Sequence, residues 1–236
     1  MKIQVLASSD AVAKMAAKII AVKASEAVAA RGRFVMAVSG GRTPWQMLRA
    51  LADEPVPWSN LHVVQVDERV APAGDPDRNL THLRESLLEY APLPPEQIHA
   101  MPVEEEDLDA AAASYARLLH QIAGPALDLA HLGLGPDGHT ASLVPGDPVL
   151  GVTDRDVALT GVYQQRRRMT LTYPILNRSR SILWLVTGPE KAGMLARLQR
   201  GDVSIPAGRI RQDGALVLAD CAAAEKVNPD LRGGDS

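Results

Sequence analysis

The stretch "ALDLAHLGLGPDGHTASLVPG" (residues 126–146) joins an apolar segment, typical of a strand, to a loop rich in glycine. Gly133, Gly135 and Gly138 have the GxGxxG spacing of dinucleotide-binding loops. Such a loop opens into a crossover helix, whose N-terminus binds the pyrophosphate. Pro145 follows the last glycine too soon for a crossover helix to form. We therefore expect no nicotinamide cofactor, and the loop must serve another purpose.

The rest of the chain alternates between strand and helix patterns, which predicts a doubly wound, mostly parallel sheet with helices on both faces, a Rossmann-like α/β fold. We expect a single domain over residues 1–228 and a disordered tail over 229–236. Strands are predicted at 3–7, 33–38, 61–66, 126–134, 168–172, 181–188 and 214–220. Helices are predicted at 10–30, with Asp10 as N-cap and Gly32 as terminator, and at 44–51, 79–90, 107–123, 189–199 and 222–227.

The composition narrows the class of function. Hydrophobic residues make up 46% of the chain, enough for a core that needs no disulfide or metal. A net charge of −3 gives no basic surface for nucleic acid or anionic membranes, and Cys221 is the single cysteine. The N-terminus lacks the pattern of a signal peptide, and no apolar run approaches about 18 residues. We expect a cytoplasmic protein without nucleic-acid or membrane partners.

Three polar loops each follow a predicted strand: "SGGRTP" (39–44), "DERVAP" (67–72) and the loop that begins at Gly135. In doubly wound sheets, ligands bind beyond the carboxyl ends of the strands. Because these three loops leave the sheet at that edge, we expect them to form one binding site. This convergence is the strongest functional indication in the sequence.

The loop "SGGRTP" has the chemistry of an anion site. Gly40 and Gly41 let backbone N–H groups approach a ligand, Thr43 adds a hydroxyl, and a helix N-terminus follows. A sugar phosphate would fit such a loop. The loop lacks the Gly-Lys-Ser/Thr ending of a Walker A motif. The alternative is a tight turn between strand and helix without any ligand.

The loop "DERVAP" places charges where a strand ends. Arg69 could bind a phosphate or carboxylate through two parallel hydrogen bonds. Asp67 and Glu68 could orient that arginine or bind sugar hydroxyls. The alternative is a solvated charge cluster with an internal ion pair.

The "DGHT" segment places Asp137 two residues before His139. Histidine is the side chain best suited to proton transfer near neutral pH, and a carboxylate beside it could fix its tautomer. The other histidines are interpreted as structural or surface residues: His62, His82, His99, His120 and His131. No second ligand stands at metal-binding spacing, so we expect no metal.

Two further cations are candidates for the same site. Lys191 lies in the first turn of a predicted helix, after the strand 181–188, where a cation opposes the helix dipole. Arg168 is the arginine of "QQRRRMT" (164–170) that lies nearest a strand. For both, an exposed surface position is the alternative interpretation.

Taken together, these motifs resemble the 6-phosphogluconolactonase family of the pentose phosphate pathway. The matching segments, in family order, are "SGGRTPWQML", "VDERVAP", "DRNLTHLRESLL", "LGLGPDGHTASLVPG", "RMTLTYPILN" and "LVTGPEKAGML". The resemblance covers roughly residues 30–200 and is most specific around His139. It implies a fold related to the glucosamine-6-phosphate deaminases, a cofactor-free hydrolysis of a phosphosugar lactone, and a monomer or small homo-oligomer.

The resemblance also implies roles for individual residues. His139 is the catalytic acid/base, oriented by Asp137, and Arg69 and Lys191 are phosphate ligands. Gly40 and Gly41 lie against the sugar phosphate. Arg42 departs from the small hydroxyl residue usual in the family, and Arg78 in "DRN" replaces a common serine. Arg42 therefore either adds a phosphate contact or points outward.

The implied reaction is attack of water on C1 of 6-phosphoglucono-δ-lactone, with His139 as the base. A glucosamine-6-phosphate deaminase is the nearest alternative, but such enzymes typically read "DEY" and "DGHIAFNEPGS" where this chain reads "DER" and "DGHTASLVPG". A sugar-phosphate sensor domain of a repressor is a second alternative. The chain shows no helix-turn-helix and no basic patch for that role.

Overall fold

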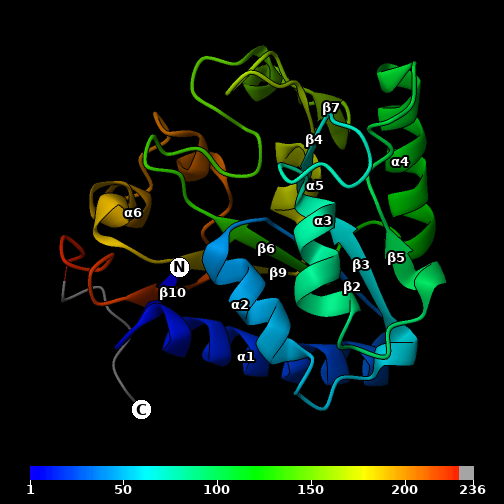
Figure 1. Ribbon diagram of the computed structural model, residues 1–236. Helices are drawn as coiled ribbons and strands as arrows, with labels where there is room; N and C mark the ends of the chain where they lie inside the picture. The colour runs from blue at the N-terminus through cyan, green and yellow to red at the C-terminus, as the bar shows by residue number, and fades with distance from the viewer. Residues whose placement is uncertain (229–236) are drawn as a thin grey trace.

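In the computed structural model, which describes residues 1–228, seven parallel strands form one sheet with helices on both faces (Figure 1). This confirms the predicted doubly wound fold. The predicted disordered tail, 229–236, lies outside the described residues. The strands of this sheet are β1 (Lys2–Leu6), β2 (Phe34–Val38), β3 (Leu61–Gln65), β5 (Ile98–His99), β6 (Leu129–Gly133), β9 (Ser181–Val186) and β10 (Leu216–Asp220). The helices are α1 (Ser9–Arg31), α2 (Arg42–Leu51), α3 (Asn79–Leu83), α4 (Leu108–Ala123), α5 (Tyr173–Arg178) and α6 (Ala192–Gln199).

The strand order β1-β10-β9-β6-β2-β3-β5 contains a reversal that positions the site. From β2 the chain first adds β3 and β5 on one side, and then returns to add β6, β9 and β10 on the other side. The reversal lies between β2 and β6. The loops that begin at Ser39 and Gly135 therefore leave the sheet on either side of a topological switch point, where such folds bind ligands.

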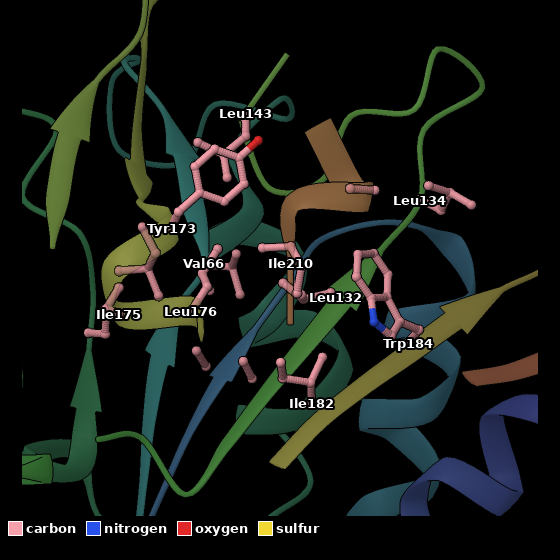
Figure 2. Packing of buried hydrophobic residues seen from close by; sticks show 14 of the residues in the cluster. Val66, Leu132, Leu134, Leu143, Tyr173, Ile175, Leu176, Ile182, Trp184 and Ile210 are labelled. Carbon is pink, nitrogen blue, oxygen red and sulfur yellow. The ribbon is translucent and has the colours of Figure 1, made fainter. Parts of the chain in front are cut away.

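Alternation along the central strands divides the core into two layers. In β2, Val35 and Ala37 belong to the cluster beneath α4, whereas Phe34 and Met36 belong to the cluster beneath α1 and α2. Figure 2 shows part of the α4-side layer, where Trp184 of β9 lies in the same cluster as residues of α5. The central strands β2, β6 and β9 are buried on both faces, as expected for parallel strands.

A second, antiparallel sheet of three short strands was not predicted. It consists of β4 (Asp67–Arg69), β7 (Val157–Leu159) and β8 (Arg168–Leu171), in the order β4-β8-β7. The chain turns out of the main sheet at Val66, whose carbonyl accepts a hydrogen bond from the Leu171 N–H at 2.8 Å. The segment "DER", interpreted as a loop, is thus a strand, and the predicted strand 168–172 belongs to this second sheet.

Several element ends also differ from the predictions. Ser8, not Asp10, is the N-cap of α1, because its hydroxyl accepts the Ala11 N–H at 3.2 Å. Gly32 ends the helix with φ 74°, as predicted. The predicted helix 79–90 continues beyond α3 as a π-helical turn, Arg84–Leu88. Residues 222–227 form turns and no helix.

Within residues 1–228, no helix is both long enough and apolar enough to cross a membrane.

Candidate active site

A cleft of about 640 Å³ lies at the carboxyl edge of the sheet, beside the switch point. It collects side chains from the main sheet, the second sheet and the turn before α6. Nine of the predicted site residues line it: Gly40, Gly41, Arg42, Thr43, Asp67, Arg69, His139, Arg168 and Lys191. The tenth, Asp137, is hydrogen-bonded to His139. Segments far apart in the sequence therefore meet in one cavity.

The paired side chains of the opening loop are Asp137 and His139. The Nδ1 atom of His139 lies 2.6 Å from Oδ1 of Asp137, and the His139 backbone N–H donates to the same oxygen at 3.1 Å. Burial raises the pKa of Asp137, but the charge of His139 and its hydrogen bonds outweigh burial and lower the pKa overall. Because the ionised carboxylate only accepts, Nδ1 must carry the proton. The Nε2 atom is then the basic nitrogen of the neutral ring.

Two glycines of this loop, Gly135 and Gly138, are required by the packing around His139. A Cβ atom at Gly135 would lie 2.1 Å from His139 Nδ1, so only glycine allows the ring to pack there. Gly138 has φ 86°, and a Cβ on it would meet Ile205 at 2.7 Å. The Gly135 N–H donates to the His139 carbonyl at 2.8 Å and closes the loop. Gly135 and Gly138 thus belong to a tight turn that presents His139, whereas Gly133 is the last residue of β6.

Asp137 has a second partner in the hairpin that joins β7 to β8. The hydroxyl of Tyr163 donates to Oδ2 of Asp137 at 3.3 Å. The Tyr163 ring also meets the His139 ring edge-on, with centroids 5.8 Å apart and planes at 66°. Both carboxylate oxygens of Asp137 are therefore occupied by described side chains.

Arg69 is held at the cleft by Asn79. The Nη1 atom of Arg69 donates to Oδ1 of Asn79 at 2.5 Å and to the Asp77 carbonyl at 2.9 Å. Asn79 Nδ2 in turn donates to the Asp67 carbonyl at 2.9 Å. A Cβ at Gly40 would collide with Asn79 Oδ1, so this glycine is required for packing as well as for any anion.

The two carboxylates of "DER" differ in environment. Asp67 lines the cleft and accepts the Ser142 hydroxyl at 2.5 Å through Oδ2. Glu68 is fully buried outside the cleft lining and cannot bind sugar hydroxyls, which corrects one of the two predictions for this residue. It accepts the backbone N–H groups of Arg69, Asn79 and Leu80, each at 2.8 Å. Glu68 therefore caps α3 and fixes the backbone of Arg69.

His131, which lies in β6, anchors the loop before α2 through two hydrogen bonds with Ser39. The backbone N–H of Ser39 donates to His131 Nδ1 at 3.2 Å, and the Ser39 hydroxyl donates to the His131 carbonyl at 3.0 Å. Thr43 shares a 2.7 Å hydrogen bond with Thr187, the residue that follows β9. Arg42 is exposed at the rim, where it can reach a ligand or solvent.

Arg168 lies in β8 and is buried, although it faces the cleft. Its Nη2 atom donates to Gln164 Oε1 at 3.0 Å, and its guanidinium lies 5.0 Å from the Tyr163 ring centroid. The buried Nε atom has no hydrogen-bond partner among the described residues. Lys191 lies half-buried in the turn Pro189–Lys191 and forms no ion pair within residues 1–228.

Some cleft residues were not predicted. Asn79 lies in the motif "DRNLTHLRESLL", but no role was predicted for it. Asp220, at the end of β10, accepts the Gly188 N–H through both carboxylate oxygens, at 3.1 and 3.2 Å. Thr187 and Ser9 also line the cleft. None of these four has a spacing that marks it in the sequence.

The fold and the cleft are those of an α/β protein with a candidate ligand site at the switch point of a doubly wound sheet. The chain belongs to the glucosamine-6-phosphate isomerase/6-phosphogluconolactonase family, whose model matches residues 7–218. A 6-phosphogluconolactonase of Synechocystis is 35% identical, covering 97% of this chain and 99% of the relative. A 6-phosphogluconolactonase of Mycobacterium tuberculosis is 36% identical, covering 95% of this chain and 98% of the relative.

Solved structures give the same result for the fold. The crystal structure of 6-phosphogluconolactonase from Thermotoga maritima has a TM-score of 0.83 and 28% identity, covering 93% of this chain and 98% of that one. A monomeric glucosamine-6-phosphate deaminase has a TM-score of 0.85 and 21% identity, covering 96% of this chain and all of that one. At 21% identity, the likeness to the deaminase shows a shared fold alone.

Proposed function

We propose that this enzyme is a 6-phosphogluconolactonase, which hydrolyses 6-phosphoglucono-δ-lactone to 6-phosphogluconate in the pentose phosphate pathway. The single observation that carries the proposal is the hydrogen-bonded pair of Asp137 and His139 at the wall of a cleft that also contains cationic side chains. The names of relatives about 35% identical over nearly the whole chain support the same activity. The substrate is a free small molecule, and the reaction needs no cofactor.

The phosphate of the substrate binds to the cations of the cleft. Arg69 is oriented by Asn79, so its guanidinium is fixed before the substrate arrives. Lys191 contributes a second cation, and the backbone of Gly40 and Gly41 contributes N–H groups near the start of α2. Arg42 at the rim and Arg168 in the wall can extend this set. A site with several cations, in which Lys191 has no competing ion pair among residues 1–228, favours a dianionic group.

His139 acts as the base and then as the acid. Nε2 takes a proton from water as the water oxygen bonds to C1 of the lactone, and the carbonyl oxygen gains the negative charge. When the tetrahedral intermediate collapses, the bond between C1 and the ring oxygen breaks, and His139 returns the proton to that oxygen. Asp137 holds Nδ1–H throughout and stabilises the imidazolium that forms.

The lactone hydrolyses spontaneously, so the test compares rates at matched pH and buffer. Freshly prepared 6-phosphoglucono-δ-lactone is mixed with the purified chain, and acid release is followed against a reaction without protein. We expect a rate proportional to enzyme concentration, and no ammonia from glucosamine 6-phosphate under the same conditions. Ammonia release without acceleration of the lactone reaction would favour a deaminase, which shares this fold.

A further inference from the structure

Tyr163 connects the pair of Asp137 and His139 to the second sheet. It lies between β7 and β8, and it is not part of the cleft wall. Its hydroxyl reaches Asp137, its ring edge meets His139, and the Arg168 guanidinium stacks on the same ring at 5.0 Å. One side chain thus contacts His139, its carboxylate partner Asp137 and the buried guanidinium of Arg168.

The hairpin that carries Tyr163 has an unfavourable backbone. Tyr163 and Arg166 exchange two backbone hydrogen bonds, at 3.0 and 3.2 Å, across a two-residue loop. Both loop residues, Gln164 and Gln165, have positive φ, 49° and 66°. Two-residue hairpin loops of this kind normally contain asparagine or glycine, because other side chains are strained there. Strain of this sort persists where the surrounding structure enforces it, and it clusters at functional sites.

The surroundings of the hairpin do enforce it. Arg166 forms ion pairs with Asp75 at 3.0 Å and with Asp77 at 3.1 Å. The Asp77 carbonyl also accepts a hydrogen bond from Arg69, so the hairpin and the Arg69 side chain share one support. Gln164 in turn accepts a hydrogen bond from Arg168 through its side-chain oxygen. The strained loop is therefore tied to both sides of the cleft.

We propose that Tyr163 is a positioning residue, which keeps the Asp137 carboxylate turned toward His139 and the Arg168 side chain in the cleft. Oδ1 of Asp137 receives both hydrogen bonds from His139, and its Oδ2 receives the Tyr163 hydroxyl. Without that hydroxyl, Oδ2 is open to water, since the Asp137 side chain is 37% exposed. Water would then compete for the carboxylate and allow it to rotate away from Nδ1.

The Tyr163 hydroxyl carries its proton at neutral pH and can therefore donate. Burial, together with the charge of Asp137, raises the pKa of Tyr163 above its ordinary value, so the phenol keeps its proton at neutral pH. At 3.3 Å the hydrogen bond is longer than the common O–H···O distance, which makes its effect modest. Loss of the whole ring should cost more, because the contacts with His139 and Arg168 disappear as well.

The test separates hydroxyl from ring with two variants. Y163F keeps the ring and should lower kcat about fivefold with KM nearly unchanged, as expected for one weak hydrogen bond to a charged group. Y163L should lower kcat by about 30-fold and also raise KM, because Arg168 loses its support. Tyr90, which stacks under Arg49 at 3.9 Å and lies outside the cleft lining, provides the matched control, and Y90F should change neither constant.

A second measurement does not depend on the activity, which matters because the kinetic test rests on the proposed function. The His139 Nδ1 proton, held by Asp137, should give a downfield proton NMR resonance in the wild type, and this resonance should broaden through exchange in both Tyr163 variants. The melting temperature should stay unchanged in Y163F. Unchanged kcat together with an unchanged resonance in Y163F and Y163L would overturn the role of Tyr163. If the wild type fails to hydrolyse the lactone, the proposed function fails, and the resonance still decides for or against Tyr163.

Discussion

Two histidines that belong to one strand and its loop have opposite environments. His131 lies inside β6, is completely buried, and its Nε2 atom has no partner among the described residues. His139 lies in the loop beyond β6, has a side chain 23% exposed at the cleft, and is paired with Asp137. Burial without a charged partner lowers the pKa of His131 to about 4, so its imidazole is neutral under ordinary conditions.

The difference shows what makes a histidine useful for proton transfer. His131 can only accept the Ser39 N–H, because charging the ring in the core would cost too much free energy. His139 instead is hydrogen-bonded to a carboxylate and lines the cleft. The chain thus uses the same residue type as a fixed acceptor in one place and, we propose, as an acid/base in the other.

The largest effect is expected from removal of the base. H139A should lower kcat by about 10³-fold, within the range of general base catalysis, while binding of 6-phosphogluconate is retained. Steady-state kinetics and titration calorimetry check the two halves of this prediction. The exposed His120 supplies the control, because H120A should keep full activity. Turnover near the wild-type rate in H139A would contradict the assignment.

The buried histidine, His131, is tested by the pH dependence of the free energy of unfolding. In the unfolded chain His131 binds a proton at its ordinary pKa of 6.5, and in the folded chain only near pH 4. The unfolded state therefore binds more protons in this interval, and stability falls as the pH is lowered from 6.5 to 4. His131 should contribute about 3 kcal/mol to that fall.

The variant for this measurement is H131N, since the amide oxygen can still accept the Ser39 N–H. Denaturant unfolding gives the free energy of unfolding at pH 6.5 and at pH 4. The loss of this free energy between the two pH values should be about 3 kcal/mol smaller in H131N than in the wild type. Equal pH dependence in the two proteins would show that His131 titrates in the folded state as it does in the unfolded state. At neutral pH, H131N should keep most of its activity, because the contact with Ser39 remains.

Without the Asp137 carboxylate, His139 has no charged partner within residues 1–228, as is the case for His131. D137N should lower kcat by about 100-fold, because the imidazolium loses its charged partner and the tautomer is no longer fixed. Substrate binding should change little, so the loss appears in kcat. The exposed Asp154 offers a matched control, and D154N should behave like the wild type. An equal loss in both variants would argue against a specific role for Asp137.

A smaller effect than that of D137N should come from the phosphate side of the cleft. R69M should raise KM about tenfold, the value of one hydrogen bond to a charged group, with a much smaller change in kcat. Its counterpart is R49M, because Arg49 lies outside the cleft lining and stacks on Tyr90. If R69M lowers kcat and leaves KM unchanged, Arg69 acts on the reacting centre and not on the phosphate.

The main sheet and the meeting point of the loops follow from local features of the sequence. The central strands β2 and β9 are nearly continuous apolar runs, and the carboxyl ends of parallel strands necessarily share an edge. Pro145 excluded a crossover helix, and Asp137 with His139 stood out for their chemistry. These features predict the fold class and most of the residues that share the cleft.

The second sheet and its residues could not be predicted in this way. β4 and β7 are three residues long, too short to show a period, and β4 pairs with a strand far along the chain. The burial of Glu68 and the contact of Tyr163 with Asp137 depend on that pairing. Sequence spacing also cannot tell a glycine that binds an anion from Gly135, which makes room for an imidazole.

The central claim is that His139 acts on the carbonyl carbon of a phosphosugar lactone. The most direct test is a crystal structure of the protein with the product 6-phosphogluconate bound. We expect the C1 carboxylate within about 3 Å of His139 Nε2 and the phosphate on Arg69 and Lys191. A product bound with its phosphate at His139 and C1 near Arg69 would contradict the account.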